Sequence, residues 1–331
     1  MESEKSETWE NKRLEELREG DFIVTPGGDI SKQEVPHWYD AKQFNRAKKV
    51  YKDYFASVNF SHLCGLLLSF YFSKNIKTLL STGESSSKTA LLHRYLMTIR
   101  HIQKWYEGDV WDVNDPAHRS LATVRSMHAR VAKRMAARND GIVYVSQWDM
   151  AVTQWAFVGP MVLFKSRVGL HGCSDEDYKA LIHFWRVIGY LLGIEDKYNL
   201  CDGNYEQTVS ACQNLLEKEY KVRMSNPDPS SVNMAKNVVA AMSLIQDFLT
   251  WESMANYIHD LVDLPCPESM CLVDYICHYF MRFMMLYVIQ YDTARSLFNG
   301  FTRWKLDMAE KKDTELQKSK KHLLSTNVSA G

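Results

Sequence analysis

Two histidine-bearing segments carry the side chains best suited to chemistry. In the first, Arg94, Thr98 and His101 stand at positions i, i+4 and i+7, so a helix would place a cation, a hydroxyl and an imidazole on one face. His93, Met97 and His101 would form an adjacent row. Such groups need a partner wherever they are partly buried. Ordinary salt bridges on a surface stripe would supply one, and so would a bound ligand.

The second segment is a predicted helix over residues 116–135, with His128 at the centre of its apolar stripe. An imidazole in that position is most often a core histidine that a neighbouring group satisfies. A neutral imidazole in a water-poor slot is also what an axial ligand of haem iron requires. Periodicity leaves both interpretations open. The rest of the stripe consists of Leu121, Val124, Val131 and Met135.

The elements that must position these side chains are all helical. From Tyr39 onward apolar residues recur every three or four positions, and strict alternation is nearly absent, which predicts an all-α fold. The best strand candidate is the short run 141–146 (GIVYVS). The predicted helices are 2–18, 40–55, 57–73, 87–106, 116–135, 147–165, 174–193, 205–223, 231–256, 268–298 and 300–315.

Composition divides the chain into three parts. Residues 1–38 read as a charged helix followed by a Gly- and Pro-containing loop, and residues 39–300 as one all-α domain. Residues 301–331 read as a final helix and a Lys-rich tail. We expect the last ~15 residues of that tail to be disordered.

Charge and motif content exclude several classes of protein. The 40 Lys and Arg residues balance the 40 Asp and Glu residues, and no long basic block precedes the tail, so we expect no nucleic-acid partner. P-loop, Rossmann, α/β-hydrolase and HExxH motifs are absent. The seven cysteines form no CxxC pair, and the first 20 residues lack an apolar stretch. We therefore expect an intracellular protein with reduced thiols.

The segment 271–290 is long and apolar enough to suggest a membrane helix, but three polar residues interrupt it. Asp274, His278 and Arg282 recur at i, i+4 and i+8, so they form one stripe. We interpret the segment as a buried core helix whose one polar stripe is either paired with other side chains or hydrated. The alternative is a helix that lies against a membrane or a partner, which would mean peripheral membrane association.

Taken together, the two histidine-bearing segments resemble one known family. Arg94 and Thr98 match an Arg-x-x-x-Thr pattern, and Val124, His128 and Val131 match a pattern that follows 30 residues after the threonine (128 − 98 = 30). The segments 148–155 and 178–194 resemble later helices of the same family. The chain thus resembles, over about residues 55–265, the rubber oxygenase (latex clearing protein) family, which includes the endoplasmic-reticulum-bound oxygenases of mycophenolic acid synthesis.

The resemblance implies a globin-like helical core, with additional flanking helices, that binds haem b. His128 would be the proximal iron ligand, with Val124 and Val131 beside the haem, and Arg94 and Thr98 would line the distal side. The implied activity is attack of O2 on a C=C bond of an apolar, isoprenoid- or lipid-like substrate. Family analogy also implies a cytoplasmic or endoplasmic-reticulum membrane-associated location.

The chain departs from the family pattern at two positions. Met97 stands where rubber oxygenase has a lysine before the distal threonine, so Met97 or His101 is the candidate sixth ligand of the iron. The family's distal acid has Glu84 as its nearest counterpart. Two other hypotheses therefore stay open: a non-catalytic haem sensor or electron-transfer protein, and a cofactor-free helical interaction protein.

Overall fold

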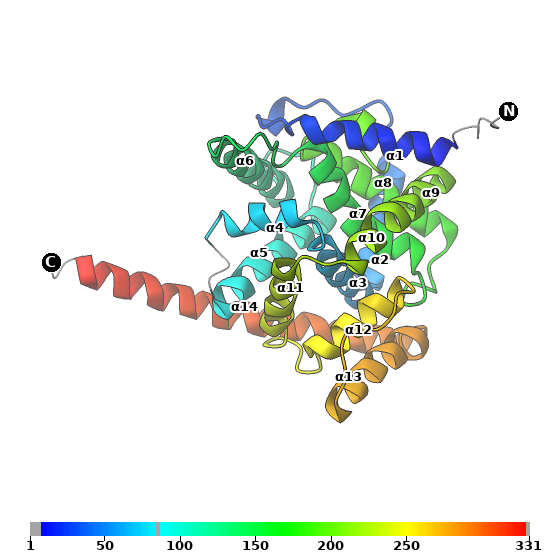
Figure 1. Cartoon of the computed structure of the whole chain (residues 1–331), viewed down its shortest axis with the longest axis vertical. Coiled ribbons are helices and arrows are strands. Elements are labelled where there is room, and N and C mark those ends of the chain that lie inside the picture. Colours follow the sequence, from blue (N-terminus) through cyan, green and yellow to red (C-terminus); the bar gives the residue numbers. More distant parts are fainter. Residues whose placement is uncertain (1–7, 84–86, 329–331) are drawn as a thin grey trace.

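The chain folds into an all-α molecule (Figure 1), as its periodicity predicts. The computed structural model describes residues 8–83 and 87–328, with side chains up to Ser319. Within that part the sole β pairing is an isolated bridge between Val24 and Ser146. The helices are α1 (Trp9–Glu19), α2 (Ala41–Asp53), α3 (Phe55–Ser69), α4 (Ser73–Leu80), α5 (Lys88–Glu107), α6 (Pro116–Ala136), α7 (Gln147–Leu163), α8 (Asp175–Leu191), α9 (Tyr205–Leu215), α10 (Lys221–Ser225), α11 (Pro229–Met242), α12 (Trp251–Leu261), α13 (Leu272–Phe283) and α14 (Asp292–Val328).

Helix α3 packs across α7 at the centre of the molecule, and both helices are buried on nearly all sides. A Cβ added to Gly65 of α3 would lie 1.7 Å from the carbonyl oxygen of Ala156 in α7. The two backbones therefore touch, and only glycine permits that separation. This crossing fixes the position of every helix that packs on α3 or α7.

Aromatic side chains fill the layers on either side of this crossing. The ring of Tyr106 lies between those of Tyr51 and Phe184, at centroid distances of 4.1 and 3.9 Å. Trp155 and Trp185 are almost completely buried, as the sequence predicts, and their indole nitrogens donate to the Cys212 carbonyl and the Tyr106 hydroxyl. Large rings with satisfied polar atoms stabilise a close-packed interior.

The histidine-bearing helices begin where local capping signals place them. The Ser87 hydroxyl accepts from the Ala90 amide at the start of α5, and the Asp115 carboxylate accepts from the Ala117 amide at the start of α6. Pro116 occupies the first position of α6, where its missing N–H leaves no bond unmade. α5 then packs antiparallel against α6 and also against α11.

Several predicted elements are wrong, each for a local reason. The predicted helix 231–256 divides into α11 and α12, because residues 243–250 form turns and Thr250 caps α12 through the Ser253 amide. The predicted helix 268–298 also breaks, after a π-helical turn over Met284–Val288. The predicted strand 141–146 makes only the isolated bridge at Ser146, because Val145 has a left-handed φ of 55°. Helix α4, which bends sharply from α3, is not predicted at all.

The C-terminal region also differs from its prediction. α14 runs unbroken from Asp292 to Val328, so it includes the predicted helix 300–315 and most of the tail expected to be disordered. Figure 1 shows its far end projecting away from the helical body. In the described part of the chain, no single helix is long and apolar enough to cross a membrane, although the bent pair α3 and α4 passes a length and composition test. Both helices of that pair pack within the protein.

The α3–α7 crossing generates a stability prediction. Replacing Gly65 by Ala forces a methyl group into the Ala156 carbonyl, so the free energy of unfolding should fall by about 3 kcal/mol or more. In a chain of this size that loss lowers the thermal midpoint by roughly 4 °C or more. Gly300 is the matched control, because it is exposed on α14 with no atom near its missing Cβ. Gly300→Ala should raise stability by about 0.5–1 kcal/mol. Equal midpoints for the two variants, measured by circular dichroism, would contradict the close crossing.

Candidate functional site

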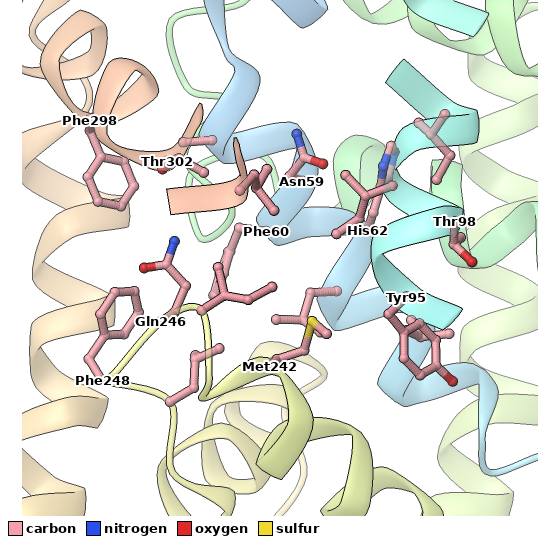
Figure 2. Close-up of a pocket in the computed structure, with 18 of the residues that line it drawn as sticks. Asn59, Phe60, His62, Tyr95, Thr98, Met242, Gln246, Phe248, Phe298 and Thr302 are labelled. Carbon is pink, nitrogen blue, oxygen red and sulfur yellow. The ribbon is translucent and has the colours of Figure 1, made fainter. Parts of the chain in front are cut away.

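An apolar cavity lies between α3, α5, α14 and the segment that joins α11 to α12 (Figure 2). It holds about 1000 Å³ of empty space, counting the part that opens to solvent. Nearly all of its lining is apolar, which suits an apolar ligand. Figure 2 shows Phe248 and Phe298 at one end and His62 and Thr98 towards the other. The lining residues include Phe60, Leu63, Leu66, Ile99, Ile102, Phe157, Met242, Ile245 and Met285.

His62 is the polar group most deeply placed in this cavity. The side chain is buried, and neither ring nitrogen has a hydrogen-bond partner among the described residues. The ring instead meets Phe157 and Trp185 edge to face, at centroid distances of 5.1 and 5.5 Å. Burial lowers the pKa of His62 from its ordinary 6.5 to about 3, so the imidazole is neutral at physiological pH. It can therefore donate one hydrogen bond and accept another.

Other polar groups of the cavity are also unpaired or only locally paired. The hydroxyls of Tyr95 and Thr302 are buried without a partner among the described residues. Asn59 donates to the Phe55 carbonyl of its own helix at 2.8 Å. Burial raises the pKa of Tyr95 above its ordinary range, so its hydroxyl stays protonated. A pocket that is mostly apolar with a few polar groups is typical of small-molecule sites.

Sequence reasoning missed His62. Its signal in the sequence is a lone histidine in the apolar run 61–72, within the predicted helix 57–73. A helix that is buried on all sides has no polar face, so periodicity cannot single out one of its residues. What marks His62 as a site residue is the absence of neighbouring acceptors, which only the packing reveals.

His128 lies on α6 with its Nδ1 atom buried and without a partner among the described residues. Burial, and secondarily the Arg94 guanidinium, lowers the pKa of His128 to about 4. The Arg94 guanidinium therefore lies near enough to His128 to oppose protonation of its imidazole. Val124 and Val131 flank His128 on the same helix and pack against the core. An uncharged imidazole with a free nitrogen is the state in which histidine binds a metal.

The remaining predicted site residues do not converge on His128. Thr98 lines the apolar cavity and donates to the Arg94 carbonyl at 3.1 Å. Met97 lies in a second cleft, between α5 and α14, together with His93. His101 is hydrogen-bonded through Nδ1 to the Ser120 hydroxyl at 2.6 Å. Thr98, Met97 and His101 therefore lie in three different environments, although all three belong to α5.

Arg94 reaches the turn that follows α4. Its Nη1 donates to the Thr82 hydroxyl at 2.8 Å, while Arg134 of α6 donates to the Ser81 carbonyl at 3.0 Å. The two bonds therefore hold the turn after α4 against the first turns of α5 and the last turn of α6. Glu84, the nearest counterpart of the family's distal acid, lies outside the described residues.

His128 is suited to bind haem iron, because its imidazole is neutral and its Nδ1 atom has no partner among the described residues. Met97 and His101, the candidate ligands for the opposite side of the iron, are engaged elsewhere. In the described part of the chain, no group of three His, Cys, Asp or Glu side chains could hold a metal ion.

Comparison with known proteins identifies one family and one similar structure. Residues 56–306 match the family described as "ER-bound oxygenase mpaB/B'/Rubber oxygenase, catalytic domain". The solved structure described as "Structure of Latex Clearing Protein LCP in the closed state" is similar at 14% identity, over 85% of this chain and 76% of that chain. The TM-score of the two structures is 0.48. No curated protein matches the chain in sequence.

The neutral state of His62 predicts a specific pH dependence of stability. Between pH 6.5 and about pH 3 the unfolded chain protonates this imidazole and the folded chain does not. The free energy of unfolding should therefore fall as the pH falls through that window, with His62 contributing up to about 1.4 kcal/mol per pH unit. His62→Leu should show a slope shallower by one bound proton in urea titrations at several pH values. Identical slopes for the two proteins would show that His62 titrates normally.

Proposed function

Because this chain belongs to the family of mpaB and rubber oxygenase catalytic domains, we propose that it is a haem-dependent oxygenase acting on an apolar substrate. In finer terms, the reaction is oxidation or cleavage of a C=C bond of an isoprenoid- or lipid-like molecule by O2. The family match confirms the resemblance predicted over residues 55–265 and extends it to residue 306. All seven cysteines are free thiols, which supports the expected intracellular location.

The observation that carries the haem proposal is the unpaired imidazole of His128. His128 would hold the iron, with Val124 and Val131 supplying apolar surface on the same helix. A haem held there would supply the redox-active iron that oxygen chemistry requires. Arg94 acts on His128 as a positioning residue, because its charge opposes protonation of the imidazole and keeps it available as a ligand.

The apolar cavity supports the proposal for the substrate. Its apolar walls favour the burial of an apolar chain, such as that of an isoprenoid or a fatty acyl group. His62 would hydrogen-bond a hydroxyl or carbonyl of the substrate and so fix its position along the cavity. α5 contributes Tyr95 and Thr98 to the cavity and Arg94 to the surroundings of His128, so one helix connects the two halves of the site.

Haem content tests the ligand assignment directly. Protein expressed with a haem supply should show a Soret band near stoichiometric amount, and His128→Gln should lose most of it. The matched control is His118→Gln on the same helix, since His118 is buried but already bonded through Nδ1 to the Val110 carbonyl at 2.9 Å. Haem content unchanged in His128→Gln would remove His128 as the ligand.

The same spectrum separates the other two functions. A ferrous form that readily binds carbon monoxide has an open coordination position, as an oxygenase needs. A low-spin spectrum without added ligand would favour a non-catalytic haem protein, an alternative motivated by Met97 in place of the family's lysine. A folded protein with no Soret band would leave the cofactor-free interaction protein.

The role of His62 is testable with two isoprenoids that differ in their polar end. The wild-type chain should bind farnesol and farnesene, and His62→Leu should weaken farnesol binding by about two- to tenfold, the range of one net hydrogen bond. Farnesene, which has no hydroxyl, serves as the matched ligand and should bind both proteins equally. Equal losses for the two ligands in a competition fluorescence assay would mean that His62 shapes the cavity without bonding the substrate.

A further inference from the structure

Helix α13 turns its polar residues inward and its apolar residues outward. Asp274 and His278 are buried, and His278 Nδ1 lies 3.3 Å from the Ser253 carbonyl of α12. Arg282 is paired with Asp260 of the same neighbour. The polar stripe of segment 271–290 is thus paired, in agreement with its prediction, but the prediction of a buried core helix is wrong. What faces solvent is the apolar side: Leu272, Val273, Tyr275, Ile276, Tyr279, Phe280 and Phe283.

This apolar surface continues from α13 into the start of α14. Tyr287 and Tyr291 extend it through the π-helical turn, and Leu297, Phe301 and Trp304 add exposed surface from α14. We call the whole set, from Leu272 to Trp304, the aromatic face. Leu272 and Leu297 each expose more than two-thirds of their surface, at 76% and 71%. Large apolar side chains that are exposed together, as along α13, mark an interaction site on a folded protein.

We propose that the aromatic face binds the surface of a lipid bilayer. Tyrosine and tryptophan combine an apolar ring with a polar atom, which suits the boundary between acyl chains and headgroups. The face holds tyrosines at 275, 279, 287 and 291 and a tryptophan at 304. The polar groups of α13 point away from this surface, so a bilayer would not have to desolvate them.

The charge of the adjoining chain favours the same occupant. α14 continues beyond Trp304 and projects from the body (Figure 1), and its sequence becomes rich in lysine. Between residues 311 and 321, Lys311, Lys312, Lys318, Lys320 and Lys321 outnumber Asp313 and Glu315. An apolar face followed by a basic segment is the combination by which peripheral proteins attach to anionic membranes.

The aromatic face also adjoins the apolar cavity. Phe280 of the face packs against Phe248, at a centroid distance of 5.4 Å, and Phe248 lines the cavity. Phe298, which also lines the cavity, stands between the exposed Leu297 and Phe301 on α14. A bilayer bound to this face would therefore lie beside the elements through which a lipid could enter. This last step rests on the proposed function, whereas the binding of the bilayer does not.

Vesicle binding by the full-length chain tests the proposal. The probe is phosphatidylcholine vesicles, with and without phosphatidylserine, sedimented together with the protein. The wild-type chain should bind both, and more strongly when phosphatidylserine is present. The double variant Ile276→Asp/Phe283→Asp should lose about tenfold or more in binding, because two charges replace inserted apolar side chains. Both positions are exposed, at 62% and 56%, so the fold does not depend on them.

The matched control is Val222→Asp/Phe22→Asp, at positions exposed by 61% and 83% outside the aromatic face. It should bind vesicles as the wild-type chain does, and both double variants should keep the wild-type unfolding midpoint. Equal binding by the two double variants would overturn the proposal. So would a wild-type chain that ignores vesicles and elutes as a dimer which only Ile276→Asp/Phe283→Asp dissociates, since the face would then bind a second copy. None of these measurements requires catalytic turnover. The result for vesicle binding is therefore independent of whether the proposed oxygenase activity is found.

Discussion

The contact between the backbones of α3 and α7 is the constraint on which the rest of the structure depends. Gly65 leaves no room for even a methyl group against Ala156, so the two helices cross at a fixed separation. α3 carries His62 into the cavity and α7 carries Phe157 to meet it. The edge-to-face position of the imidazole is therefore a consequence of the crossing, and so is its isolation from any hydrogen-bonding neighbour.

Two neutral histidines define the two halves of the candidate site, and they are neutral mainly for one reason. Burial costs the charged form more than the neutral form at both His62 and His128, and Arg94 adds to that cost only at His128. Each imidazole keeps at least one nitrogen unpaired in the described part of the chain. An unpaired buried polar atom lowers stability unless a ligand satisfies it, so both positions favour the ligand-bound protein.

The sequence predicts the parts of this molecule that depend on neighbours along the chain. The starts of α5 and α6 follow from local signals, because Ser87 and Asp115 cap the first turns that the predicted helices 87–106 and 116–135 require. The orientation of α13 does not, because Asp274 and His278 turn inward only where α12 offers them partners. His62 cannot be identified from the sequence for a related reason, because a helix that is buried on all sides has no periodic pattern of polar residues.

One wall of the cavity is made of turns rather than helix. Residues 243–250 contribute Ile245, Gln246 and Phe248 to the lining, and a bond from Lys305 to Asp247 holds the segment against α14 at 3.0 Å. Sequence changes in such a segment leave the central crossing untouched, whereas changes on α3 disturb it. Relatives of this protein can therefore diverge in substrate range through this short wall while the fold stays the same. The turn segment is the natural place to introduce diversity when new substrates are sought by directed evolution.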